Sequence, residues 1–257
     1  MNASTASELR SKAQKLLIIP GKIPLYLFPV ILYILSPLFI LGMLLAFSDI
    51  YNAQFHLATI IPWIFEMLLL FMLLSANFAL LDSLRGYRDK VQIADSSIAF
   101  SEEILGKLFV TSLLKWVYTI LWLWPSGIAI LIFIFKIKYE IYGPKILDFI
   151  VAIIFFALLF GGIILAIIKY YSYSMSYYIL YDQINQGTYT NPNDVITKST
   201  KLMNGNKWRY FCLQFSFIGW DILTAIFWIP MNFYVLPYKQ AAQVVFYDEL
   251  LNLKQTN

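Results

Sequence analysis

Apolar blocks about 20 residues long alternate with shorter polar segments along most of this sequence. A helix needs about 20 apolar residues to cross a hydrocarbon core of about 30 Å. The pattern therefore predicts an all-α fold, a polytopic transmembrane helical bundle. A transmembrane β-barrel would need alternating segments of about 10 residues, and the sequence lacks them.

We expect about six spans in a single transmembrane domain, residues 23–257, after a basic cytoplasmic N-terminal segment, residues 1–22. Five spans are the alternative, if the last block lies in the interface or only extends the fifth span. The expected spans cover residues 24–47, 60–81, 108–135, 146–170, 208–227 and 228–250.

Short amphipathic patterns lie between these blocks. One face of the N-terminal segment carries Leu9, Ala13, Leu16 and Leu17. This face predicts a helix on an anionic cytoplasmic surface, and a frayed basic tail is the alternative. A short interfacial helix is expected near Ser101, and the pattern of the fourth block continues to about Ile184. Another amphipathic helix is expected after a cap at Asn193 or Asp194, with its end at Gly205.

Lysine and arginine are unevenly distributed among the polar segments. Residues 1–22, 82–107 and 169–209 hold most of them, against three in residues 136–145. Because basic residues stay on the cytoplasmic side, the N-terminus is predicted to be cytoplasmic. The composition agrees with a membrane protein, since 60% of the residues are hydrophobic and 13% are charged. The net charge of +4 is then explained by basic residues that orient the spans in the membrane, and we expect no nucleic-acid partner.

Four polar residues inside the apolar blocks are candidates for function: Glu66, Asn77, Lys115 and Asp221. A charge at the centre of a span costs about 2.5–3.5 kcal/mol. Glu66 and Asp221 fall at similar depth, which suggests a proton- or cation-responsive pair between spans two and five. Alternatively, Glu66 reaches the outer headgroups and Asp221 caps a break before Pro230. Lys115 is near enough to the inner edge for its amine to reach out of the membrane.

Four basic residues gather where the fifth block begins: Lys198, Lys201, Lys207 and Arg209. They could bind anionic lipid headgroups, at about 1 kcal/mol per residue, or simply form the basic flank of the span. Ser216, Gly219 and Trp220 form a predicted helix-packing motif, in which small residues let a neighbouring helix approach. Gly161 and Gly162 suggest the same in the fourth block.

Catalytic motifs are missing from the sequence. Cys212 is the one cysteine and His56 the one histidine, so neither a Cys/His metal site nor a Ser-His-Asp triad can be built. No P-loop, GxSxG or HExxH arrangement is present. We therefore expect no enzymatic activity, no cofactor and no metal.

A series of short motifs covers residues 169–251. They are Tyr173-Ser174-Met175, Tyr178-Ile179-Leu180, Lys207-Trp208-Arg209, Ser216-Phe217-Ile218-Gly219-Trp220, Pro237-Tyr238 and Phe246-Tyr247. In order and spacing this series resembles the bacterial integral membrane proteins grouped as domain of unknown function 975, found mostly in Gram-positive bacteria. The first half is similar to that family more loosely, through its basic N-terminal helix and Leu84-Arg85-Gly86. The resemblance implies a bacterial membrane protein and implies no biochemical activity.

Two functions are compatible with these observations. The first is a non-enzymatic, multi-pass plasma-membrane protein that acts through contacts with anionic lipids, another membrane protein or a second copy of itself. It would serve as an accessory subunit, an envelope-stress component or an immunity-type protector. The alternative is a small transporter or channel that uses Glu66 and Asp221.

Overall fold

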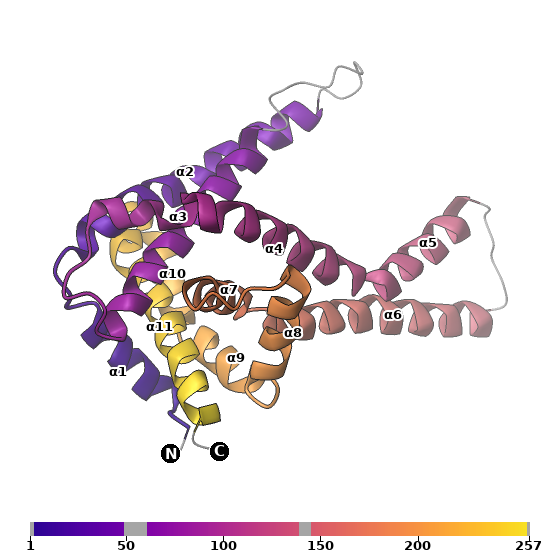
Figure 1. Cartoon of the computed structure of the whole chain (residues 1–257). Coiled ribbons are helices and arrows are strands. Elements are labelled where there is room, and N and C mark those ends of the chain that lie inside the picture. The colour runs from indigo at the N-terminus through magenta and orange to yellow at the C-terminus, as the bar shows by residue number, and fades with distance from the viewer. Residues whose placement is uncertain (1–2, 49–60, 139–144, 256–257) are drawn as a thin grey trace. The chain divides into compact units, whose positions relative to one another are not determined.

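The structure is a computed structural model that describes residues 3–48, 61–138 and 145–255, and this part of the chain is helical without strands. The chain divides into two compact units, residues 1–106 with 208–257 and residues 107–207 (Figure 1). The first unit contains α1 (Ala6–Leu16), α2 (Lys22–Ser48), α3 (Ile61–Leu84), the 3-10 helix η3 (Ile93–Phe100), α9 (Lys207–Phe215), α10 (Ile218–Ile226) and α11 (Trp228–Gln255). The second contains most of α4 (Glu102–Leu121), then α5 (Trp124–Lys138), α6 (Lys145–Ser172), α7 (Ser176–Asn185) and α8 (Pro192–Leu202).

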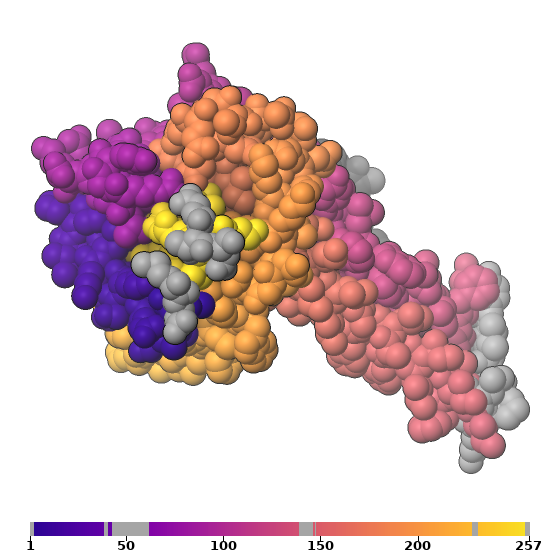
Figure 2. All heavy atoms as spheres, turned by 60° about the horizontal axis from the view of Figure 1, so that its bottom comes forward, coloured from indigo at the N-terminus to yellow at the C-terminus, as the bar shows by residue number. Residues whose placement is uncertain are grey.

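Helix α1 is amphipathic and has a defined start. The Thr5 hydroxyl accepts a hydrogen bond from the Glu8 N–H, and the Glu8 carboxylate accepts one from the Thr5 N–H, which satisfies two free donors at the helix start. The buried residues of this helix are Leu9, Ala13 and Leu16. They pack against α11, and Figure 2 shows the indigo N-terminal segment beside yellow C-terminal residues. The N-terminal segment is thus a helix, as predicted, but its apolar face is buried within the protein and not free for a lipid surface.

Helix α11 is the centre of the first unit, where it packs against α1, α2, α3 and α10. Its fully buried positions include Ala241, Ala242, Val244 and Phe246. The preceding helices run antiparallel to it, because Tyr210 packs on Phe246 near one end and Trp220 packs on Tyr234 near the other. The fifth and sixth apolar blocks therefore form one hairpin.

A glycine permits a close contact near the start of α2. Gly21 has a φ of +91°, and a Cβ there would collide with the Val91 carbonyl. The Val91 N–H donates to the Pro20 carbonyl at 3.1 Å. The chain after α3 is thereby held against the turn that joins α1 to α2.

Two of the predicted spans are interrupted. The block 108–135 is not one helix, because α4 ends at Leu121 and α5 begins at Trp124. Pro125 lies in the first turn of α5, where its missing N–H is tolerated, and it disfavours helical geometry in the residue before it. The block 208–227 divides at Ser216, whose hydroxyl donates to the Leu213 carbonyl. Such local bonds compete with the helix ladder.

Three helical stretches in the described part of the chain are long and apolar enough to cross a membrane. They are Pro62–Leu84, Glu102–Leu121 and Asp148–Asn185, and Lys22–Leu38 is a shorter apolar helix. The structure thus supports a helical membrane protein and does not by itself give six spans. Residues 49–60 and 139–144, which lie between expected spans, are outside the described residues.

In the second unit, α5 runs out and α6 returns beside it (Figure 1). The Ser126 hydroxyl donates to the Leu159 carbonyl at 2.7 Å. A Cβ on Gly162 would collide with Ser126, whereas a Cβ on Gly161 would meet no described atom within 4 Å. Close packing is therefore confirmed at Gly162 and not at Gly161.

Helix α8 begins earlier than predicted. Its cap is Asn191, whose side chain accepts from the Asp194 N–H at 2.8 Å, so the expected cap at Asn193 or Asp194 is wrong. Pro192 explains the difference, because proline favours the first helical position. The apolar face is buried as expected, and Ser199 donates to the Ser172 carbonyl at the end of α6.

Candidate functional site

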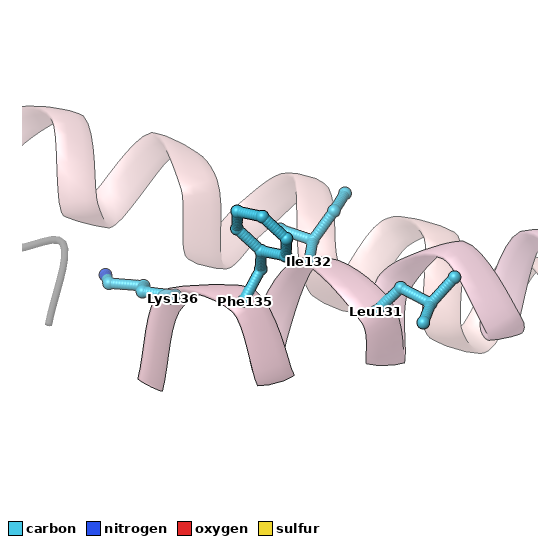
Figure 3. A pocket seen from close by; sticks show the side chains of 4 residues that line it. All are labelled: Leu131, Ile132, Phe135 and Lys136. Carbon is cyan, nitrogen blue, oxygen red and sulfur yellow. The ribbon is translucent and has the colours of Figure 1, made fainter. Parts of the chain in front are cut away.

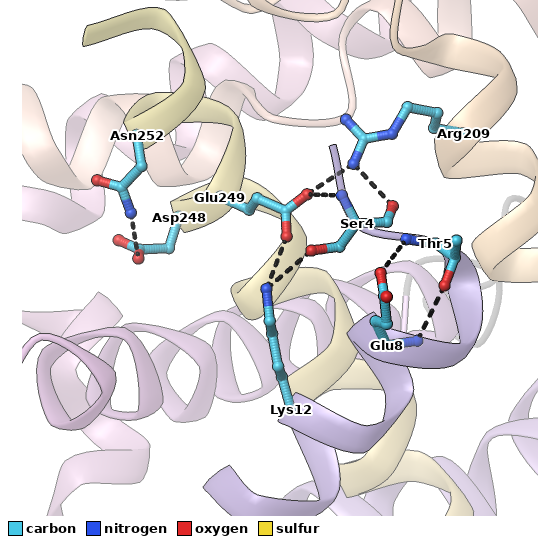
Figure 4. A network of polar contacts seen from close by, with 8 residues as sticks. All are labelled: Ser4, Thr5, Glu8, Lys12, Arg209, Asp248, Glu249 and Asn252. Carbon is cyan, nitrogen blue, oxygen red and sulfur yellow. Dashed lines mark hydrogen bonds and ion pairs between the residues drawn. The ribbon is translucent and has the colours of Figure 1, made fainter. Parts of the chain in front are cut away.

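Two adjacent carboxylates at the polar end of α11, Asp248 and Glu249, connect three separate segments. Glu249 accepts hydrogen bonds from Lys12 Nζ at 3.0 Å, Arg209 at 2.6 Å and the Ser4 N–H at 2.9 Å (Figure 4). The side chain of Glu249 is 12% exposed. This carboxylate holds the N-terminal segment and the start of α9 to α11.

Asp248 extends the same cluster to the chain that follows α3. It accepts from Arg85 Nε at 3.0 Å and from the Asn252 amide at 3.1 Å, and the Arg85 guanidinium lies 5.9 Å from the Tyr247 ring centroid. We call Lys12, Arg85, Arg209, Asp248 and Glu249 the ionic cluster. Its basic residues come from the three segments that the distribution of lysine and arginine predicts to lie on one side of the membrane.

The electrostatics of Glu249 follow from these contacts. Burial alone would raise the pKa of its carboxyl, but hydrogen bonds from Ser4, Lys12 and Arg209 outweigh it and lower the pKa to about 2. The group is therefore ionised at neutral pH and acts as an acceptor. A carboxylate in this state holds cations and does not serve as a general acid.

Sequence reasoning missed this cluster. Asp248 and Glu249 are not among the candidate residues of the sequence analysis, and Arg209 is there a candidate for lipid binding. One signal was present: two adjacent acids follow an apolar block, and the segments predicted on the same side are basic.

Asn77, a predicted intramembrane polar residue, is buried between three helices of the first unit. Its amide donates to the Gln240 side-chain oxygen on α11 at 2.6 Å, and its oxygen accepts from the Tyr26 hydroxyl on α2 at 3.3 Å. Asn77 is 2% exposed. Its polar atoms are used in packing α2, α3 and α11.

Glu66 and Asp221 also lie in the first unit, on α3 and α10. In the described residues, Oε1 of Glu66 is buried without a hydrogen-bond partner. Asp221 lies in the first turn of α10 and pairs with Lys239 of α11 at 2.8 Å. Of the two predicted acids, Asp221 thus has its own counter-ion.

Lys115 faces aromatic rings in the second unit. Its Nζ lies 4.3 Å from the Tyr177 ring centroid and 5.6 Å from that of Tyr170. Lys169 similarly lies 4.0 Å over the Trp122 ring. Both contacts have the geometry of cation–π interactions.

The four candidate lipid-binding residues are divided between the units: Lys198, Lys201 and Lys207 belong to the second and Arg209 to the first. Lys198 pairs with Asp194 at 2.7 Å. Hydrogen bonds lower the pKa of the Asp194 carboxyl, and the one from Lys198 has a larger effect than the one from Gln183. Lys198 and Arg209 therefore both hold a carboxylate of their own unit.

The predicted packing motif lies where α9 meets α10. The Ser216 carbonyl, released by the break between the helices, accepts from the Arg10 side chain at 3.0 Å. Trp220 packs on Tyr234 and Tyr238 of α11. Gly219 is exposed, and a Cβ there would meet no described atom within 4 Å, so close packing comes from Trp220 and its neighbours.

A shallow apolar hollow lies on α5 (Figure 3). It has a volume of about 390 Å³ and is lined by Leu131, Ile132, Phe135 and Lys136. Its one charged group, Lys136, pairs with Asp148 at 2.7 Å. The hollow offers apolar contact and no constellation for acid–base chemistry.

The described residues contain no group of three or more His, Cys, Asp or Glu side chains that could hold a metal ion, and His56 lies outside the described part. Comparisons with curated proteins and with solved structures find no match. Comparison with known families matches residues 1–254 to the family described as Protein of unknown function (DUF975). This match extends the resemblance of the second half to nearly the whole chain, and the chain belongs to the DUF975 family.

Proposed function

We propose that this protein is a multi-pass protein of a bacterial plasma membrane that acts without catalysis, through contacts with protein or lipid. An accessory, envelope-stress or immunity-type role fits such contacts. The observation that carries the proposal is the apolar surface of α5 and α6. Side chains at least half exposed there include Leu131, Phe133, Phe135, Ile146, Phe149, Ile153, Phe156, Phe160 and Ile164. An exposed apolar surface of this kind marks contact with a membrane or a partner.

The ionic cluster supports six spans and a cytoplasmic N-terminus. Because Glu249 binds Ser4 and Lys12, the two ends of the chain meet, and an even number of crossings puts both ends on one side. The hairpin of α9–α10 and α11 supplies the fifth and sixth spans. The positive-inside rule then assigns the basic ionic cluster to the cytoplasm.

Extraction of the tagged full-length protein in native nanodiscs, followed by mass spectrometry of proteins and lipids, tests the contact role. We expect a stoichiometric protein partner or enriched anionic lipid that is lost when Phe156 and Phe160 are both changed to Ala. The matched control is Trp208→Ala, which changes an exposed aromatic residue of the other unit. A protein that emerges with bulk lipid alone would argue against the proposal.

A small transporter or channel is the second candidate, favoured by the buried Oε1 of Glu66, which has no hydrogen-bond partner among the described residues. Glu66→Gln is the sharper test, because Asp221→Asn also breaks the ion pair with Lys239. Proton and cation flux is measured in proteoliposomes, with Glu103→Gln as the control for an exposed acid. Equal flux in Glu66→Gln, Asp221→Asn and the parent would exclude this function.

A further inference from the structure

The helices of the second unit are interrupted at two places that lie beside each other. One break lies between α4 and α5, and the other lies at the turn between α6 and α7. A hydrogen bond joins them, because Trp122 Nε1 donates to the Tyr173 hydroxyl at 3.2 Å. The Tyr118 ring also packs on Tyr173, at 6.3 Å between centroids. The two helix breaks are therefore in direct contact with each other.

Lysine and aromatic side chains surround this pair of breaks. Lys169 lies over Trp122, and Lys115 lies over Tyr177. We call Lys115, Tyr118, Trp122, Lys169, Tyr173 and Tyr177 the tyrosine–lysine belt. Tryptophan, tyrosine and lysine gather at the headgroup level of membranes, where the rings are apolar and the polar atoms stay wet.

On one side of the belt, α6 is apolar over a length that fits a bilayer. Between Asp148 and Lys169 it has 20 residues, so the two charged residues are about 32 Å apart at 1.5 Å per residue, against a hydrocarbon core of about 30 Å. The far limit is marked by the ion pair of Lys136 with Asp148. Charged groups thus stand at both ends of an apolar segment of the right length.

On the other side of the belt, α4 lies beside a polar part of the chain. The Tyr118 hydroxyl donates to the Asn193 side chain of α8 at 2.7 Å, and Lys107 lies 5.1 Å over the Tyr189 ring. Helix α8 carries Asp194 and Lys198, and charged groups are costly to place inside hydrocarbon. These contacts place the start of α4 and Tyr118 beside polar groups of the second unit, although Leu113 and Trp116 of α4 are more than half exposed and its length and composition alone would allow a crossing.

We propose that the tyrosine–lysine belt lies at the phospholipid headgroups, that α5 and α6 occupy the hydrocarbon, and that α4 up to Tyr118 lies outside it. The partner of the belt is the phosphate layer of the bilayer, which complements its lysines. The inference rests on the proposed membrane location. It moves the start of the third span from Leu108 to about Trp122.

Spin labels at single cysteines test this placement. Cys212→Ser provides the background, and the labels replace exposed residues at Leu113 of α4, Leu131 of α5, and Phe156 and Ile146 of α6. The full-length protein is reconstituted in vesicles of phosphatidylethanolamine and phosphatidylglycerol. Collision with oxygen, which concentrates in hydrocarbon, is compared with collision with a water-soluble nickel chelate.

We expect the oxygen-to-nickel collision ratio to be several-fold higher at Leu131 and Phe156 than at Leu113 and Ile146. A ratio at Leu113 equal to that at Phe156 would overturn the belt as the boundary and leave the membrane location standing. Nickel access at all four positions would overturn the membrane location as well. A second α4 label at Trp116 replaces Leu113 if that variant loses the helical circular dichroism of the parent.

Discussion

At the scale of single residues, Glu249 shows how a charge can be used for structure in this protein. It receives one donor from the N-terminal segment's backbone, one from α1 and one from α9. Charge-assisted hydrogen bonds of this kind are roughly twice as strong as neutral ones. A side chain at the end of one helix thereby fixes two other segments.

Glu249→Gln tests this role through its pH dependence. The folded pKa is about 2, below that of an unfolded glutamate, so the stability from this group is present above about pH 4 and is lost as pH falls toward 2. We expect the variant to be about 2 kcal/mol less stable at pH 7. The measurement is denaturant unfolding in detergent at several pH values.

The difference between parent and Glu249→Gln should shrink as pH falls. Glu103→Gln, which removes an exposed acid, serves as the control and should leave stability nearly unchanged. A constant difference across the pH range would show that the loss comes from packing and not from the ionised carboxylate.

At the scale of helices, the breaks and close contacts depend on individual residues with specific chemistry. Pro125 lies in the first turn of α5, where the sequence shows one continuous apolar block. Gly162 lets α6 approach Ser126 of α5, and the Ser126 hydroxyl then finds the Leu159 carbonyl. The hairpin of α5 and α6 is thus defined by a proline, a glycine and a serine.

Replacing Gly162 by Val should separate α5 from α6, because the added carbons would occupy the position of the Ser126 backbone and hydroxyl. We expect a loss of about 1–3 kcal/mol, typical of overpacking, seen as a lower melting temperature in detergent. Gly161→Val is the matched control. A Cβ at Gly161 would meet no described atom within 4 Å, and the substitution changes the helix propensity by the same amount as Gly162→Val. Equal melting temperatures for the two variants would show that the close contact between Gly162 and Ser126 does not cause the loss of stability.

At the scale of the whole molecule, both ends of the chain meet within the first unit. The polar end of α11 binds the N-terminal segment, and Arg85 after α3 joins the same ionic cluster. Segments far apart in the sequence are therefore fixed beside one another. The basic members of the ionic cluster come from the three segments that hold most of the lysine and arginine residues.

Cysteine labelling in intact cells checks this arrangement. On the Cys212→Ser background, Ser7→Cys and Lys254→Cys should react with a membrane-impermeant maleimide only after lysis. Lys138→Cys, at the end of α5, should react in intact cells. Labelling of Lys254→Cys without lysis would place the C-terminus outside and would leave five spans.

The sequence determined that this is a helical protein of membrane type. Three features of the sequence carry this information: apolar blocks of a set length, the excess of basic residues in alternate polar segments, and the motifs after Lys169. They are local or periodic, so they depend on the order of residues and not on the tertiary fold. They predicted the helix of the N-terminal segment, the buried face of α8 and the family. They also placed Gly162 in close packing.

The tertiary structure decided which side chains meet. Asp248 and Glu249 are neighbours in sequence, but their partners Lys12, Arg85 and Arg209 come from segments that fold together only through helix packing. The same holds for Asn77 with Gln240 and for Trp122 with Tyr173, which lie far apart along the chain. The position of a helix break likewise depends on which groups satisfy the freed backbone atoms, as the Arg10 guanidinium does when it donates to the Ser216 carbonyl. Periodicity carries no information on such contacts, because it describes each helix without its neighbours.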